Sequence, residues 1–181
     1  GLYGRINSYF PNTELEATNT PPPAANKTAQ EKRANMRKAD ALLKEAGWIV
    51  KDGKRVNAKS GKPFTFEILL DDPGNEKIAL SFVRALTRLG MTANVRVLDS
   101  ADFLGRLNNY DFDMTLYYWM STLSPGTEQY LYWSCEAADQ PSRWNYAGIC
   151  DKNIDLLSKS IPSAKSREEL VKNVRALDAA L

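Results

Sequence analysis

The order of elements predicted along this chain indicates an α/β fold, a mostly parallel βαβαβ sheet flanked by helices in three layers. Three apolar runs have strand length: residues 64–70, 93–98 and 112–119. Two segments with helical periodicity separate them, residues 75–89 and 100–109. Because each crossover is one helix long, the three strands are expected to be parallel, with right-handed crossovers.

The first part of the chain lacks such periodicity. Residues 1–29, with the triplet Pro21-Pro22-Pro23, are predicted to be an irregular lead-in or linker, and residues 30–181 to form the α/β lobe. The lead-in runs through Thr18 to Gln30 without a clear helix or strand pattern.

A helix and a hairpin are predicted next. Residues 30–46 place Met36, Leu42 and Leu43 on one helical face, and Gly47 stands where a left-handed C-terminal cap is expected. Asp52-Gly53 then separates two short apolar segments, which is typical of a tight β-hairpin.

The first crossover helix, residues 75–89, is expected to bury one apolar face against the sheet. The inward residues are predicted to be Ile78, Phe82, Leu86 and Leu89. Residues 71–74 end the preceding strand with two acids, a proline and a glycine, a turn composition.

The last part of the chain is predicted to be helical. A helix is expected over residues 126–133, a second one after Asp151, and a third that opens with Ser166 and Glu169 as a capping box. The third helix carries an apolar stripe, expected to pack on the sheet or on a portion of the protein outside this chain. The stripe consists of Leu170, Val174, Leu177 and Leu181.

Composition excludes several function classes. The chain has 181 residues, 43% hydrophobic and 25% charged, and a net charge of +2 with the two signs interspersed. No basic footprint for nucleic acid is present, and no apolar run approaches the roughly 20 residues of a membrane helix. Since the chain opens on Gly1 and stops at Leu181 inside a predicted helix, it is expected to be a domain excised from a longer protein.

Catalytic chemistry has no positive support. The chain contains no histidine, no G-x-S-x-G elbow and no phosphate-binding glycine loop, and no cofactor is expected. Two carboxylate pairs, Asp71/Asp72 and Asp111/Asp113, could act as acid and base, but solvated turn residues explain them more simply. We therefore predict no catalytic and no metal-binding residues.

Residues 111–155 are the most distinctive segment, with three of the four tryptophans and both cysteines. In open parallel sheets, ligands bind beyond the carboxyl ends of the strands, which places the segment after Trp119 at the ligand edge. Core packing is the alternative for any single aromatic residue. The residues predicted to bind ligand are Trp119, Met120, Ser121, Thr122, Arg143, Trp144, Asn145 and Tyr146.

Two of these predictions carry open alternatives. Arg143 could hold a carboxylate or phosphate in a bidentate grip, and a solvated loop cation is an equal alternative. The amide of Asn145 could pair with a peptide backbone or make a local turn.

Cys135 and Cys150 flank an irregular stretch, and we favour a disulfide that pins it. Two unrelated buried thiols are the alternative. Zinc is disfavoured, because two thiols without any histidine cannot complete a structural site. A disulfide would imply an oxidising compartment.

Several segments, in order, resemble one protein family: the C-terminal lobe of bacterial extracellular solute-binding proteins of family 5, the peptide/nickel class, and in particular its Yej-type oligopeptide-binding branch. The matching segments are SYFPNTELEA (8–17), ADALLKEAGW (39–48), RLGMTANVRVLDSADFLGRLNNYDFDM (88–114), LSPGTEQ (123–129), NYAGICDKNIDLL (145–157) and SREELVKNVRALDAAL (166–181).

The resemblance implies a class II periplasmic-binding-protein-like lobe, one wall of a cleft completed by an N-terminal lobe outside this chain. It implies the substrate-binding component of an ABC importer in the periplasm of a Gram-negative bacterium, with membrane association of the parent protein left open. The implied partners are an oligopeptide or peptide-like ligand and ABC permease subunits in the inner membrane, with no nucleic acid. Receptors for a sugar oligomer, a metal chelate or an opine-like compound are the alternative, and a hydrolase on a two-lobed scaffold is less favoured.

This chain departs from the family pattern in three places. Many relatives hold a peptide amine with an Asp beyond the strand that ends here at Trp119, but residues 120–123 contain no acid. Asp151-Lys152 stands where an Asp-Pro pair is frequent, and the connection across residues 18–30 is shorter than is usual in the Yej-type branch.

Overall fold

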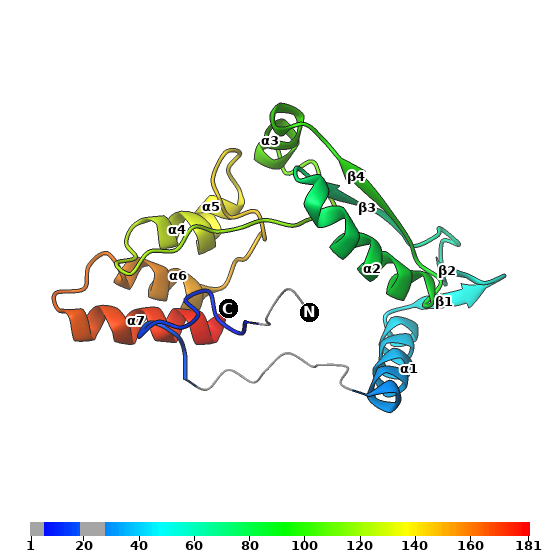
Figure 1. The fold of residues 1–181 in the computed structure, drawn as a ribbon, viewed down its shortest axis with the longest axis horizontal. Helices are drawn as coiled ribbons and strands as arrows, with labels where there is room; N and C mark the ends of the chain where they lie inside the picture. The colour runs from blue at the N-terminus through cyan, green and yellow to red at the C-terminus, as the bar shows by residue number, and fades with distance from the viewer. Residues whose placement is uncertain (1–5, 19–27) are drawn as a thin grey trace. The chain divides into compact units, whose positions relative to one another are not determined.

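The computed structural model describes residues 6–18 and 28–181, which form two compact units. The sheet unit contains residues 28–106 and 111–117, and the helical unit contains residues 6–18, 107–110 and 118–181. The lobe predicted for residues 30–181 is thus divided between two units, and part of the predicted lead-in joins the helical unit (Figure 1). The Pro21-Pro22-Pro23 triplet lies outside the described residues.

The parallel βαβαβ sheet is confirmed. Strands β3 (Thr65–Leu70), β4 (Thr92–Val97) and β5 (Met114–Thr115) are parallel in the order β4-β3-β5. The third strand is much shorter than the predicted residues 112–119. Thr115 pairs with Leu69, one residue before β3 ends, so the chain beyond Leu116 has no partner strand.

Helix α2 (Glu76–Thr87), which follows the 3₁₀ turn η1 (Pro73–Asn75), covers one face of the sheet. It buries Ala79 and Leu86 against Ile68 and Leu70. The predicted inward face was wrong in part: Ile78 and Phe82 are 43% and 45% exposed. The buried stripe runs through Ala79, Val83 and Leu86, which share one face of the helix and pack in the core with Ile68 and Leu70.

Helix α3 (Ser100–Asn108) sends a side chain to the other face of the sheet. Its Arg106 bonds Glu67, whose side chain points away from the α2 face because strand residues alternate. Helices therefore flank the sheet on both sides, the three-layer arrangement predicted from the sequence.

Helix α1 (Ala29–Glu45) and the hairpin β1 (Trp48–Lys51)–β2 (Lys54–Asn57) follow their predicted signals. Thr28 and Glu31 form a capping box at the start of α1, and Gly47 adopts φ +83° after it. Asp52 and Gly53 adopt φ of +51° and +77°, the left-handed pair that a tight hairpin turn requires.

A buried arginine fixes this hairpin to the rest of the sheet unit. Arg55 is 1% exposed, yet its guanidinium is fully engaged. It donates to the carbonyls of Leu89 at 2.8 Å and Trp48 at 3.1 Å, and pairs with the Asp40 carboxylate at 2.6 Å. One side chain thus joins α1, β1, β2 and the end of α2.

The helical unit consists of α4 (Glu128–Trp133), α5 (Cys135–Ala138), α6 (Lys152–Ser160) and α7 (Arg167–Ala180). Asp151 caps α6 as predicted, and the Ser166 hydroxyl caps α7 by accepting the Glu169 amide. The Glu169 carboxylate accepts the amide of Lys165 rather than that of Ser166, so the second half of the predicted capping box is displaced by one residue.

The apolar stripe of α7 packs in the core of its own unit. This differs from the prediction that it packs on the sheet or on a portion of the protein outside this chain. Val174 and Leu177 are completely buried in a core that also contains Phe10, Leu15, Trp133, Ile154 and Ile161. The buried Asp178 carboxylate of α7 accepts the backbone amides of Tyr9 at 2.7 Å and Ala17 at 2.8 Å. These contacts hold the lead-in on the helix, an arrangement that no periodic signal in residues 6–18 announces.

Candidate functional site

Aromatic rings of the helical unit gather around the buried Trp133. The Trp119 ring lies 4.8 Å and the Tyr9 ring 4.9 Å from Trp133 between centroids. Tyr132 lies 6.3 Å from Trp133 and 5.9 Å from Trp144. Trp133 is 1% exposed and lies beneath the other rings, whereas Trp144 is 44% exposed and Tyr9 is 38% exposed.

Hydrogen bonds connect this cluster to the segment that follows it. The indole of Trp119 donates to the carbonyl of Trp144 at 3.2 Å, and the Ser121 hydroxyl donates to the carbonyl of Tyr9 at 3.2 Å. The Tyr132 phenol donates to the Met120 carbonyl at 3.4 Å. The Met120 side chain itself is 81% exposed.

We call the accessible part of this cluster the aromatic surface: Tyr9, Trp119, Met120, Tyr132 and Trp144. Ser121 and Thr122 are exposed beside it, and the Thr122 hydroxyl also accepts the Ser124 amide. Rigid aromatic faces with hydroxyls at their edge can pack on apolar groups and bond polar ones at the same time. The arrangement is suited to binding, not to bond making.

Asn145 and Tyr146 hold the loop from inside. Asn145 is completely buried; its amide nitrogen donates to the carbonyls of Ser134 at 2.7 Å and Ile149 at 2.8 Å, and its oxygen accepts the Ile149 amide. Tyr146 is buried as well, and its hydroxyl donates to Asn108. Within the helical unit, neither side chain belongs to the aromatic surface.

Arg143 is exposed but lies apart from that surface. Its guanidinium donates to Gln140 at 3.0 Å, and it lines a small pocket of about 140 Å³ with Tyr130, Ser134 and Glu136. The phenol of Tyr110 donates to the carbonyl of Arg143 at 3.1 Å. Sequence neighbours 143–146 thus have four different surroundings.

A disulfide joins Cys135 and Cys150 and closes the segment that carries Trp144. Next to it, the Asp155 carboxylate of α6 accepts the Cys135 amide at 2.8 Å. The loop is therefore tied to α5 and α6 at both ends, and the position of the Trp144 backbone is constrained.

Tyr9 of the aromatic surface and Tyr130 beside Arg143 both have raised phenol pKa values. Burial, with the nearby Asp178 carboxylate, raises the pKa of Tyr9, and the hydrogen bond to Glu136 raises the pKa of Tyr130. Both phenols accordingly stay protonated at neutral pH. A raised phenol pKa is the opposite of what an activated nucleophile or base requires.

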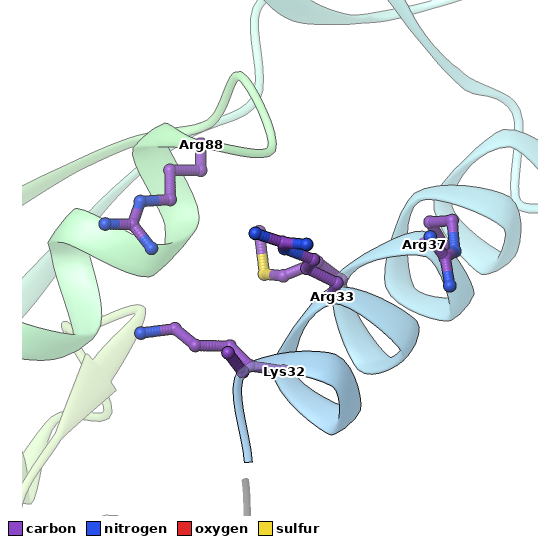
Figure 2. A pocket seen from close by; sticks show the side chains of 6 residues that line it. Lys32, Arg33, Arg37 and Arg88 are labelled. Atoms are coloured by element: carbon purple, nitrogen blue, oxygen red, sulfur yellow. The ribbon is translucent and has the colours of Figure 1, made fainter.

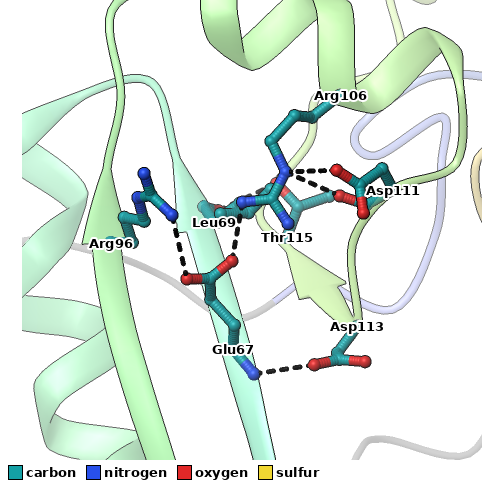
Figure 3. Close-up of polar contacts among 7 residues, drawn as sticks. All are labelled: Glu67, Leu69, Arg96, Arg106, Asp111, Asp113 and Thr115. Atoms are coloured by element: carbon teal, nitrogen blue, oxygen red, sulfur yellow. Dashed lines mark hydrogen bonds and ion pairs between the residues drawn. The ribbon is translucent and has the colours of Figure 1, made fainter.

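Three of the four acids singled out as possible catalysts have structural partners in the sheet unit, two of them drawn in Figure 3. Asp111 accepts Arg106 at 2.9 Å, and Asp113 accepts the Glu67 amide at 2.9 Å. Asp72 accepts the amide of Gly74. In the described ranges, no group of three or more His, Cys, Asp or Glu residues could hold a metal ion.

Two residues of the aromatic surface were missing from the predicted set. Tyr132 lies in a predicted helix, and its place in the aromatic-rich segment 111–155 made it a candidate that core packing could equally explain. Tyr9 stands more than a hundred positions from Trp119, and nothing local in the sequence links them.

Among residues 6–18 and 28–181, no helix has the length and apolar character needed to cross a membrane.

Comparison with known proteins places the chain in a family. The model of the bacterial extracellular solute-binding proteins, family 5 Middle, matches residues 1–141. The chain belongs to this family. The resemblance noted in the sequence, including the Yej-type relatives, is thereby confirmed.

The relatives are longer than this chain. It is 32% identical to the probable peptide-binding protein YejA of Agrobacterium fabrum, over all of this chain and 33% of that protein. It is 37% identical to the peptidoglycan-binding protein YepA of the same organism, over 77% of this chain and 22% of that protein. The chain spans about a third or less of the length of the curated relatives that it matches.

Solved structures of similar fold are binding proteins. An oligopeptide-binding protein from Thermus thermophilus, in complex with a pentapeptide, superimposes with a TM-score of 0.73 over 99% of this chain and 32% of that one, at 18% identity. The predicted α/β periplasmic-binding-protein fold is confirmed.

Proposed function

We propose that this chain forms part of the substrate-binding component of an ABC importer, which binds oligopeptides or peptide-like compounds in the periplasm and delivers them to permease subunits of the inner membrane. The observation that carries the proposal is the aromatic surface, an exposed and braced set of rings in a member of a solute-binding family. Its relatives bear the names peptide-binding and peptidoglycan-binding protein.

The chemistry of the surface suits a flexible cargo of varied sequence. Trp119, Tyr132 and Trp144 offer rigid faces that lose little conformational entropy when a ligand packs on them. Met120 adapts its shape to different apolar groups, and Ser121 and Thr122 can bond peptide carbonyls. Because residues 120–123 contain no acid, we expect the cargo to be held through its backbone and apolar side chains, with no amine anchor on this segment.

Enzymatic turnover is not part of the proposal. The carboxylates Asp111 and Asp113 are occupied by structural hydrogen bonds, and the family consists of binding proteins. We propose that the other wall of the binding cleft comes from residues outside this chain, since its relatives are about three or more times as long.

Substitution of the exposed indole tests the proposal. In the full-length polypeptide that carries this chain, Trp144→Ala should weaken binding of a peptide mixture by roughly 30-fold, as expected for a tryptophan at the centre of an interface. Mass spectrometry identifies the peptides that co-purify with the protein, and calorimetry with those peptides gives the affinity. Leu156→Ala, which changes an exposed apolar residue of α6, is the matched control and should leave the affinity unchanged.

Two outcomes would redirect the assignment. Equal affinity of the Trp144→Ala and parent proteins would remove the aromatic surface from the site. Recovery of a sugar oligomer, a metal chelate or an opine-like compound in place of peptides would keep the surface as a binding site and replace the peptide by a different solute.

A further inference from the structure

A groove in the sheet unit has a lining that the proposed cargo site does not use. It lies between α1 and the end of α2 and has a volume of about 470 Å³, within the roughly 300–1,000 Å³ typical of ligand sites. We call it the cationic groove, and its lining residues are Ala29, Lys32, Arg33, Met36, Arg37 and Arg88. Figure 2 shows Lys32 and Arg33 extending from α1 toward Arg88, the residue that follows α2.

The positive charge of this groove is not compensated within the described residues. The ion pairs of residues 6–18 and 28–181 involve other cations. Of the three α1 acids, Glu31 accepts the Thr28 amide in the capping box and Asp40 pairs with Lys44 and Arg55. The third, Glu45, is the last residue of the helix and does not line the groove. Like charges that line one groove without an acid repel one another, and an anionic occupant would offset this repulsion.

The groove also offers an apolar floor. Met36 is half-buried and Ala29 is small, and the aliphatic stems of the lysine and arginines extend the apolar lining toward the charged rim. An occupant that uses the whole lining must bring an apolar group as well as negative charge. A polypeptide segment can place an apolar side chain on Met36 and carboxylates on the guanidinium groups, whose planar fork matches a carboxylate.

We propose that the cationic groove binds an acidic segment of a protein partner, with an apolar side chain of that segment inserted beside Met36. The groove belongs to the sheet unit and shares no residue with the aromatic surface, which belongs to the helical unit. The association is expected to weaken with salt, since the rim charges are exposed to solvent.

The test uses a short fluorescent peptide of Glu-Glu-Leu repeats, with fluorescence anisotropy as the readout. The chain should bind this peptide but not the matching Gln-Gln-Leu peptide. Arg33→Glu should reduce the affinity by at least about tenfold, because the new carboxylate opposes the ligand's own charge. Raising sodium chloride from about 0.05 to about 0.5 M should weaken binding of the parent protein.

Lys38→Glu is the matched control. It makes the same charge reversal on the same helix at an exposed position outside the groove lining, so its affinity should stay within about twofold of the parent. If Arg33→Glu and Lys38→Glu lost the same affinity for the acidic peptide, binding would depend on net charge and not on the groove, and the proposal would be overturned. Circular dichroism of both variants establishes that they are folded.

Two further outcomes would assign another occupant. Binding to phosphatidylglycerol vesicles that is lost in Arg33→Glu, with no binding of the acidic peptide, would make the groove a lipid-headgroup site. Binding by this chain that disappears when it is flanked by the additional residues of the longer polypeptide would mean that those residues fill the groove. Either result overturns the proposal of a separate protein partner.

Discussion

At the scale of single residues, Asn145 shows why a site motif in a loop is hard to interpret from sequence. The amide that the sequence offers as a ligand contact is completely buried and bonded to the backbone at Ser134 and Ile149. Its neighbour Trp144 keeps an exposed ring, while Arg143 turns to Gln140. Loops lack the periodicity that assigns faces in helices and strands, so neighbouring residues can point anywhere.

The first prediction concerns the stability of this loop. Asn145→Ala should lower the free energy of unfolding of the helical unit by about 2–4 kcal/mol, because two carbonyls and one amide lose their partner inside the protein. Urea denaturation followed by tryptophan fluorescence reports on this unit, which holds Trp119, Trp133 and Trp144. Asn153→Ala, at an exposed position of α6, should change stability by less than about 0.5 kcal/mol.

At the scale of elements, a branched ion-pair network joins β3, β4, α3 and the approach to β5 (Figure 3). Glu67 pairs with Arg106 at 2.7 Å and with the more exposed Arg96 at 3.7 Å, and Arg106 also bonds Asp111. The hydrogen bond to Glu67 raises the pKa of Arg106. This network holds a two-residue edge strand that has few backbone hydrogen bonds of its own.

The second prediction tests this network. Arg106→Lys should destabilise the sheet unit by about 1–2 kcal/mol, because an ammonium cannot bond Glu67 and Asp111 with the same fork geometry. Arg96→Lys, at a long and exposed pair, should cost less than about 0.5 kcal/mol. Hydrogen exchange of the β3 amides measures both; a larger loss in Arg96→Lys would contradict the hierarchy.

The third prediction concerns the pH dependence of the ion pair between Asp40 of α1 and Arg55 of the β1–β2 hairpin. The hydrogen bonds from Lys44 and Arg55 hold the pKa of Asp40 below its ordinary 3.8. A carboxyl with a lowered folded-state pKa stabilises the fold above its unfolded pKa, and this contribution is lost as pH falls through the folded value. Asp40→Asn should thus be less stable than the parent protein at pH 6, and the difference should shrink below about pH 4.

The measurement is urea unfolding of both proteins at several pH values, with exchange at β1 and β2 as the local readout. Asp52→Asn, at the exposed hairpin turn, is the matched control and should show no such convergence. A stability difference that stays constant down to pH 2 would mean that the Asp40 carboxylate does not act through its charge.

Much of the element structure could be predicted, and the failures have a common cause. Gly47, the Asp52-Gly53 turn and Asp151 are local signals, and the structure confirms them. The face that α2 buries could not be settled, since Ile78 and Phe82 compete with Ala79 and Val83 for the inward position. Packing against the strands decided in favour of Ala79 and Val83, and no local pattern in the sequence specifies that packing.

At the scale of the whole molecule, the division into two units was beyond the sequence. The parallel sheet was predictable because each crossover joins neighbouring elements. The core of the helical unit instead joins Phe10 and Leu15 to Val174 and Leu177 across the length of the chain. Such pairings leave no local signal, and for the same reason Tyr9 was missing from the predicted site.

The final prediction tests whether the Cys135–Cys150 disulfide stabilises the helical unit, with the sheet unit as the internal control. Closing a loop of this length by Cys135–Cys150 should contribute roughly 3 kcal/mol, chiefly by restricting the unfolded chain. On reduction, the slowest-exchanging amides of α6 and α7 should therefore exchange about a hundredfold faster, whereas those of β3 and β4 should not change. The disulfide acts only on the unit whose unfolded state it constrains. A Cys135→Ser/Cys150→Ser protein should match the reduced form, and equal acceleration in β3 would show that the two units unfold as one.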